Sequence, residues 1–344
     1  MKKILLSLLL TLPAFSMMAQ NDKEPYLTKA LNNETIKNVE VQTSGGSISV
    51  SDANASDIRI EVYITGNNNS DNLSKEEIKQ RLDEKYELNI SVSNNKLVAI
   101  ARPKTKITDW KRTLNISFRV FVPKNISTDL STSGGSISLA GIAGKQAFST
   151  SGGSLNIDNV SGNISGKTSG GSIYVKNSTD DIELITSGGS IYAKNCEGNL
   201  KLITSGGSIS LKELKGNIKA TTSGGSISGM KISGELTART SAGNIDLTDL
   251  TCSLETSTSA GNIDVSVATL GKYIKINNSG GNVDLELPKG KGIDLDLSAN
   301  KIKTNELSNF TGEKNEDEIE GKLNGGGVRV DVRSGGGKIN LVFK

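Results

Sequence analysis

The chain has 344 residues, with 40 Lys and Arg against 37 Asp and Glu, so its formal net charge is only +3. A charge this small gives no reason to expect nucleic acid or an acidic membrane surface as a partner. The absence of histidine excludes Ser–His and Cys–His nucleophilic sites and all histidine metal sites. Aromatic residues make up only 4% of the chain, which suits a narrow core filled by Ile, Val, Leu and Ala.

Residues 1–19 have the pattern of a signal peptide. Two lysines precede an apolar run from Ile4 to Leu12, and the Met-Met-Ala sequence ending at Ala19 predicts cleavage before Gln20. The residue directly after the cleavage site is not a cysteine, so a lipoprotein-type anchor is not indicated. No later segment approaches the ~20 apolar residues of a membrane span. We therefore predict a bacterial protein exported to the periplasm, the cell surface or the extracellular space.

Residues 20–130 are expected to form a β-rich N-terminal cap with one short helix. One copy of a motif that recurs later, Thr-Ser-Gly-Gly-Ser-Ile, begins at Thr43. Alternating apolar residues predict strands over 58–64, 87–92, 97–101 and 114–122, with a hairpin turn at Asn94-Asn95 between the middle two. A capping box that begins at Ser74 predicts a helix over about 75–86. We expect this region to pair with the first repeat and cover it.

A basic loop from Pro103 to Arg112 contains the single tryptophan, Trp110. The loop makes Trp110 a candidate for contact with a ligand. Packing of the ring beneath the loop is the alternative interpretation.

Residues 131–287 are expected to form a stack of repeated units. The motif or a close variant starts at Thr132, Thr150, Thr168, Thr186, Thr204, Thr222, Thr240 and Thr258, each start 18 residues after the last, and a ninth copy starts at Asn278. A fixed short period is typical of stacked supersecondary units. One unit, 204–221, holds two stretches of alternating apolar and polar residues, which predict two strands. Gly206 and Gly207 predict a corner where a side chain would be crowded or φ positive.

Stacking turns each position of the repeat into a ladder of equivalent residues. Three apolar ladders are expected to face inward: Ile137, Leu155, Ile173, Ile191, Ile209, Ile227, Ile245 and Ile263; Ile164, Ile182, Leu200, Ile218, Leu236 and Leu254; and, at a corner, Ile142, Val160, Cys196, Leu214, Ile232 and Leu250. The pattern predicts an all-β protein, a parallel and by the usual crossover rule right-handed β-solenoid. The repeated threonines share the inward phase, and their hydroxyls can bond along the ladder or to a backbone carbonyl.

Residues 288–344 are expected to hold degenerate rungs and closing strands. Alternation at Ile293, Leu295 and Leu297 predicts a strand. The acidic segment 305–320 predicts a mobile loop. Two glycine-rich stretches, from Gly325 and from Gly335, predict two degenerate rungs that finish the rod.

The two cysteines are expected to be free thiols. Cys196 lies on the inner corner ladder and Cys252 is expected at a turn three rungs later. About 14 Å of stacking would separate them, far beyond the ~7 Å Cα limit for a disulfide.

Two outward ladders are candidate binding sites. Tyr174 and Tyr192 occupy one phase in successive rungs, flanked by Lys176, Lys194 and Lys212. Sugars stack on aromatic faces, so these residues are a candidate glycan platform; a stacked cross-rung pair on a solvated face is the alternative. Asp246, Asp264 and Asp284 form an acidic ladder beside three asparagines, and rows of oxygen ligands can take Ca²⁺. A solvated acidic face is the alternative there.

The repeat resembles a bacterial family of exported repeat domains of unknown function that are labelled putative adhesins. The resemblance rests on Thr-Ser-Gly-Gly-Ser-Ile at 18-residue spacing, on the Val122-Pro123 strand end before the repeats and on the glycine-rich closing strands. It implies surface interaction and supplies no catalytic residue. We therefore predict a non-catalytic exported scaffold or adhesin without a cofactor.

The predicted partner is an extracellular or envelope polymer or protein, with glycans among the candidates, and the oligomeric state is open. A polysaccharide-binding or polysaccharide-degrading β-helix protein is the alternative.

Overall fold

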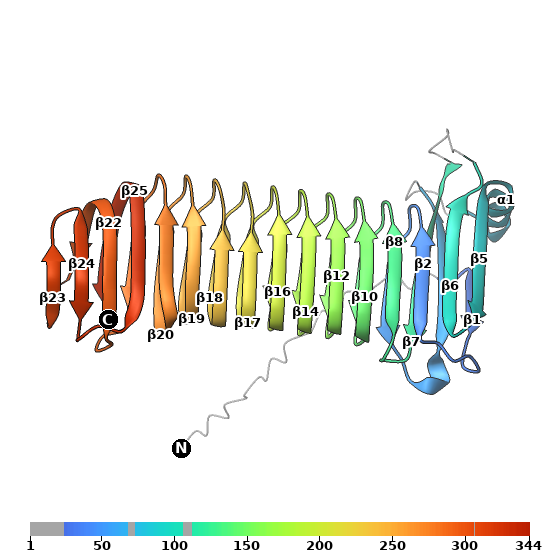
Figure 1. The fold of residues 1–344 in the computed structure, drawn as a ribbon. Coiled ribbons are helices and arrows are strands. Elements are labelled where there is room, and N and C mark those ends of the chain that lie inside the picture. The colour runs from blue at the N-terminus through green and yellow to red at the C-terminus, as the bar shows by residue number, and fades with distance from the viewer. Residues whose placement is uncertain (1–23, 68–72, 106–111, 306) are drawn as a thin grey trace, which may run out of the picture.

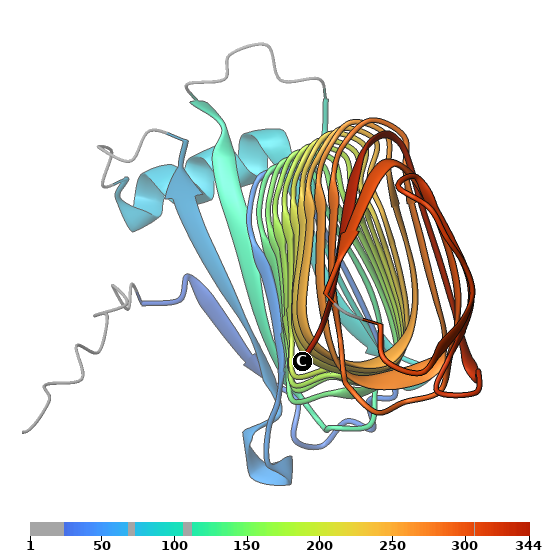
Figure 2. The same cartoon turned by 90° about the vertical axis from the view of Figure 1, so that its left-hand side faces the viewer.

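The computed structural model describes residues 24–67, 73–105, 112–305 and 307–344. Within them the chain forms one long, mostly parallel sheet that coils into a rod, with helix α1 (Lys75–Lys85) at one end (Figure 1). Seen along the rod, successive coils stack into a flattened tube and the helix lies outside it (Figure 2). The expectation of an all-β, solenoid-like fold is confirmed.

Two sequence predictions, the signal peptide and the contact role of Trp110, lie outside the described residues. Among the residues that are described, no helix is both long enough and apolar enough to cross a membrane.

Each repeat contributes two strands, one to each of two walls of the rod. The first wall begins with short strands β9 (Ile137–Ala140), β11 (Leu155–Asp158), β13 (Ile173–Lys176) and β15 (Ile191–Lys194). The second begins with β8 (Ser127–Thr132), β10 (Ala143–Thr150), β12 (Ser161–Thr168), β14 (Thr179–Thr186) and β16 (Glu197–Thr204). Further along, continuous strands serve both walls: β17 (Ile209–Thr221), β18 (Ile227–Arg239), β19 (Ile245–Thr258) and β20 (Ile263–Asn278), with β21 (Val283–Leu287) after them.

All pairings between these strands are parallel. Partners such as Leu155 and Ile173, or Thr150 and Thr168, lie at equivalent positions of consecutive repeats. Because each strand lies directly above its equivalent, side chains stack on their counterparts in the next rung, except where the register shifts between Leu247 and Leu254 of β19. The expectation of parallel pairing between the repeats is confirmed.

The three predicted apolar ladders form the interior of the rod, and every one of their members is at most 2% exposed. The corner ladder has one polar member, Ser178, which is fully buried. Its hydroxyl donates to the Lys176 carbonyl at 2.8 Å and accepts from the Val160 N–H at 3.2 Å. Both bonds satisfy a hydroxyl that would otherwise cost stability in the apolar interior.

The motif threonines are also buried and hydrogen-bonded, as expected. In one rung, the Thr150 hydroxyl donates to the Gly135 carbonyl of the preceding rung at 2.8 Å and accepts from the Gly153 N–H at 3.3 Å. The same pair of bonds recurs at Thr168, Thr186, Thr204, Thr222 and Thr240. Each hydroxyl therefore ties one corner to the corner before it.

The two glycines of the corner differ in how much room they have. A Cβ at Gly207 would lie 2.0 Å from the Gly189 carbonyl oxygen, whereas a Cβ at Gly206 would lie 3.6 Å from its nearest neighbours. Crowding, and not a positive φ, therefore requires the second glycine. The first position accepts a methyl group, and two repeats carry Ala242 and Ala260 there.

The isolated motif copy near the N-terminus is itself a turn of the rod. It forms β2 (Asn38–Thr43) and β3 (Ile48–Asp52), which pair in parallel with β8 and β9. On their other side, β6 (Lys96–Pro103) and β7 (Leu114–Val122) pair in parallel with β2 and β3. The antiparallel strands β5 (Tyr86–Ser93), β4 (Arg59–Gly66) and β1 (Leu27–Ala30) complete this end.

The strands, the hairpin turn and the helix that the sequence predicts in this region are present. Predicted and observed strand ends differ by no more than two residues, and Asn94 and Asn95 have φ of 51° and 61° in the hairpin turn. A short 3-10 turn covers Ala55–Asp57. The Ser74 hydroxyl caps α1 by accepting from the Glu77 N–H at 3.2 Å. Helix α1 packs against β5 and β7.

The C-terminal region departs from two expectations. The segment 305–320 is not the predicted loop, because much of it belongs to an antiparallel hairpin of β23 (Phe310–Lys314) and β24 (Glu318–Leu323). Strand β24 also pairs antiparallel with β22 (Ile293–Thr304). Ile319 and Leu323 are buried in this hairpin, so the acidic composition of the segment did not indicate its buried apolar residues.

The two glycine-rich stretches do not make two rungs at the end of the rod. The first precedes and the second lies within one strand, β25 (Val328–Phe343), which lies between β20 and β21 on one side and β22 on the other. The reason is local chemistry: Ser334 donates to the Gly281 carbonyl at 2.8 Å, and Gly337 sits where a Cβ would be 2.1 Å from that oxygen. The last motif copy therefore docks directly on the last regular corner.

Both cysteines are free and buried, as expected. Cys252 lies within β19 and not at a turn, and it is 2% exposed. Burial raises the pKa of its thiol to about 12.

Candidate functional site

The outward side chains of the first wall form a continuous surface, here called the short-strand face. Alternation along each strand creates it: in β13, Ile173 and Val175 point inward while Tyr174 and Lys176 point outward. Strand pairing aligns a first row of Ser138, Asn156, Tyr174, Tyr192, Ser210, Ser228, Asp246, Asp264, Asp284 and Asn340. A second row contains Ala140, Asp158, Lys176, Lys194, Lys212, Met230, Thr248, Ser266 and Glu286.

The aromatic and acidic ladders predicted as separate sites therefore share one row. Sequence reasoning missed this, although all five residues follow their motif threonine or asparagine by six positions. It also missed Met230, which occupies the lysine row one repeat after Lys212.

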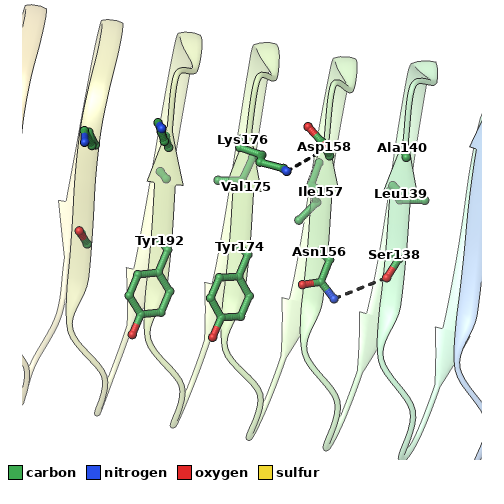
Figure 3. A pocket seen from close by; sticks show the side chains of 14 residues that line it. Ser138, Leu139, Ala140, Asn156, Ile157, Asp158, Tyr174, Val175, Lys176 and Tyr192 are labelled. Atoms are coloured by element: carbon green, nitrogen blue, oxygen red, sulfur yellow. Dashed lines mark hydrogen bonds and ion pairs between the residues drawn. The ribbon is translucent and has the colours of Figure 1, made fainter. Parts of the chain in front are cut away.

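Tyr174 and Tyr192 form a stacked pair. Their ring centroids are 4.9 Å apart with an interplanar angle of 5°, and each side chain is 46% exposed. The pair borders a shallow hollow of about 640 Å³ that extends over the neighbouring short strands (Figure 3). A flat aromatic surface beside a hollow of this size can accept a ring or another flat group.

The lysines beside the tyrosines differ in their partners. Lys176 lies 3.2 Å from Asp158, and Figure 3 shows it pointing along the row toward that carboxylate. A hydrogen bond from Asn177 and this lysine lower the pKa of Asp158. In the described part of the chain, no ion pair joins Lys194 or Lys212 to a carboxylate.

The acidic part of the row stacks three carboxylates in consecutive rungs. Burial and the nearby charges of Asp284 and Asp246 raise the pKa of Asp264. Asn340 donates to Asp284 at 3.0 Å. Among residues 24–67, 73–105, 112–305 and 307–344, no group of three or more Cys, Asp or Glu side chains could hold a metal ion.

The asparagines beside the aspartates have a structural task. The Asn244 side-chain oxygen accepts from the Asn262 N–H at 2.9 Å, and the Asn262 oxygen accepts from the Asn282 N–H at 3.0 Å. Serines do the same in earlier rungs, as Ser136 does for the Ser154 N–H. These amide oxygens are engaged in the corner, and a calcium site at the aspartates stays a prediction.

A coil of parallel strands with an apolar interior and outward polar ladders defines a β-repeat protein. The chain belongs to the Toastrack DUF4097 family, whose model matches residues 36–342. The resemblance noted from the repeat motif is thereby confirmed.

The chain is also similar to two crystal structures. One is a putative cell adhesion protein from Clostridium sporogenes, with 12% identity over 92% of this chain and 98% of that one and a TM-score of 0.20. The other is a putative adhesin from Bacteroides fragilis, with 10% identity over 92% of this chain and 96% of that one and a TM-score of 0.25. No curated protein matches the chain significantly.

Proposed function

We propose that this protein is an exported, non-catalytic scaffold, a right-handed β-solenoid of 18-residue rungs that binds a partner at the cell surface. In this proposal residues 1–19 are removed on export, 20–130 cap the rod, 131–287 form its repeats and 288–344 close it. The observation that carries the proposal is the short-strand face, which presents a half-exposed tyrosine pair beside Lys194 and Lys212, two lysines that form no ion pair with the described carboxylates.

The interior supports a role for the outer surface. Side chains of Ile, Leu and Val fill the rod along its length, so a substrate has no place between the walls. The chain has no histidine, which is the usual group for proton transfer near neutral pH. Contacts repeated at about 4.8 Å along the face suit an extended or multivalent partner.

Binding of the labelled mature protein to intact cells of the source organism tests this proposal. Replacing both Tyr174 and Tyr192 by alanine should weaken binding at least about tenfold, because it removes the exposed aromatic surface. The matched control replaces Lys167 and Lys219, which are exposed on the other wall, by alanine and should leave binding unchanged. Equal binding by both variants would show that the partner contacts another surface.

Glycan binding at the tyrosine pair is a second candidate function, favoured by the hollow beside the rings. A glycan array with the wild type and the double alanine variant tests it directly. Cleavage of a polysaccharide by the wild type, lost in Asp264→Asn, would replace the scaffold proposal by the enzyme alternative.

A further inference from the structure

Most of the charge on the short-strand face is divided into two halves, although Lys176 also pairs with Asp158 at 3.2 Å and Glu286 pairs with Lys344 at 2.5 Å. Lys176, Lys194 and Lys212 lie in three consecutive rungs on one side of β18, and Asp246, Asp264 and Asp284 lie in three consecutive rungs on the other. All six side chains point outward. Strand β18 itself presents only the uncharged Ser228 and Met230 on this face.

On the other wall and at the corners of the rod, opposite charges meet in adjacent rungs, as Lys176 and Asp158 do at one end of this face. Lys201 pairs with Glu183 at 2.7 Å, and Lys215 pairs with Glu197 at 2.8 Å. On the short-strand face, like charges lie directly opposite each other across strands, which is unfavourable within one molecule. A surface that carries the reverse order of charges would relieve both halves together.

The exposed apolar groups are concentrated on the same face. Among the described residues, four large hydrophobic side chains are exposed, and three of them are Tyr174, Tyr192 and Met230. Met230 lies at the boundary between the charged halves and is 37% exposed. Apolar contact area and complementary charge therefore coincide, as they do in protein–protein interfaces.

We infer that the occupant of the short-strand face is a second copy of this chain, packed face to face in the antiparallel sense about a two-fold axis along β18. The inference rests on the proposed use of this face as a contact surface. A two-fold interface places each residue opposite a residue of the same patch. Met230 then meets Met230 of the other copy on the axis.

Counting rungs outward from β18 gives the other contacts. The rung of Ser210 and Lys212 faces that of Asp246, the rung of Tyr192 faces that of Asp264, and the rung of Tyr174 and Lys176 faces that of Asp284 and Glu286. The rows lie about 6.6 Å apart along the strands, so a lysine reaches carboxylates in either row. A tyrosine hydroxyl can donate to the facing aspartate.

The alternative orientation, with both rods pointing the same way, brings lysines to lysines and aspartates to aspartates. Like-charge contact of this kind excludes the parallel dimer. The order of charges along the face therefore selects the antiparallel arrangement.

The contact is small. Seven rungs at about 4.8 Å and four residues at about 3.3 Å give a footprint of roughly 400 Å² per copy, which is at the low end for specific interfaces. Isolated molecules should therefore associate weakly and in a salt-dependent manner. Many copies on two surfaces would bind by avidity.

Sedimentation of the mature chain over a wide concentration range, at low and high salt, tests the inference. We expect a monomer–dimer equilibrium that salt weakens. Replacing the three lysines by glutamate (K176E/K194E/K212E), or the three aspartates by lysine (D246K/D264K/D284K), should each weaken it about 100-fold, since the symmetry repeats every contact twice. An equimolar mixture of the two variants should restore dimers.

The matched control K167E/K219E/K275E reverses three exposed lysines on the other wall and should dimerise like the wild type. Circular dichroism of each variant verifies folding. A wild type that stays monomeric at low salt, or folded variants whose mixture does not associate, would overturn the inference. If the wild type is monomeric yet still binds cells or a glycan through the two tyrosines, self-association fails and the proposed function stands.

Discussion

A single methyl group at the second corner glycine should destabilise the rod, and one at the first should not. In Gly207→Ala the new Cβ would lie 2.0 Å from the Gly189 oxygen and 2.4 Å from its carbon. Relief requires the two rungs to separate by more than about 1 Å, since ordinary carbon–oxygen contacts begin near 3.4 Å. That movement also stretches the 2.7 Å hydrogen bond from Thr204 to the same oxygen.

The expected cost follows from these two effects. Overpacking of this kind costs about 1–3 kcal/mol, and loss of one buried hydrogen bond adds about 1 kcal/mol. Gly207→Ala should therefore lower the free energy of unfolding by about 2–4 kcal/mol. Gly206→Ala places its Cβ at an ordinary contact distance of 3.6 Å. It should be neutral or stabilise by up to about 1 kcal/mol, because alanine restricts the unfolded chain.

Urea unfolding followed by circular dichroism compares the two variants, and hydrogen exchange shows where the rod opens. Repeat arrays can unfold in parts, so protection of amides in β15 and β17 should fall first in Gly207→Ala. Equal stability of the two variants would refute the assignment of crowding to the second glycine.

Three further predictions concern the core, the acidic row and the repeat length. Ile209→Asp should lower the free energy of unfolding, measured by thermal unfolding, by more than about 4 kcal/mol because the site is fully buried. The outward Ser210→Asp should lower it by less than about 1 kcal/mol. Similar losses in the two variants would mean that the strand faces are misassigned. The pKa of Asp264 is raised in the folded protein, so ionisation of this carboxyl opposes folding as pH rises from the ordinary aspartate pKa of about 3.9 through the folded pKa. Asp264→Asn should therefore stabilise the protein at neutral pH by less than about 1 kcal/mol and lose this advantage below about pH 3.9. An advantage that persists in acid would contradict the charge explanation. Deleting 204–221 joins equivalent positions of the repeat and should leave a folded, shorter rod with weaker binding; a product that is unfolded by circular dichroism would contradict this.

Much of the candidate site could be predicted from the sequence. Position within the repeat places Tyr174, Tyr192 and the three aspartates on the outside, and strand pairing confirms that equivalent positions stack. Because all five residues follow the start of their motif by the same number of positions, the sequence also implies that they share one row. The same comparison of positions within the repeat also predicts the division of charge around β18.

The burial pattern of the repeats is determined by the sequence itself. Alternation of apolar residues, a hydroxyl at each corner and a crowded glycine are local features that recur with every repeat, so each unit specifies the same contacts with the next. The place of Cys252 within β19 does not follow from the sequence in this way, because cysteine does not recur at that position of the other repeats.

The ends of the rod were decided only by the tertiary structure. Each terminal segment pairs with whichever open edge offers matching contacts, and those edges come from residues far away in the chain. Strand β25 docks on the last regular corner through Ser334 and Gly337, and it leaves β22 and the hairpin of β23 and β24 outside it. Local periodicity cannot specify that order, because it records which side of a strand is apolar and not which edge the strand will meet.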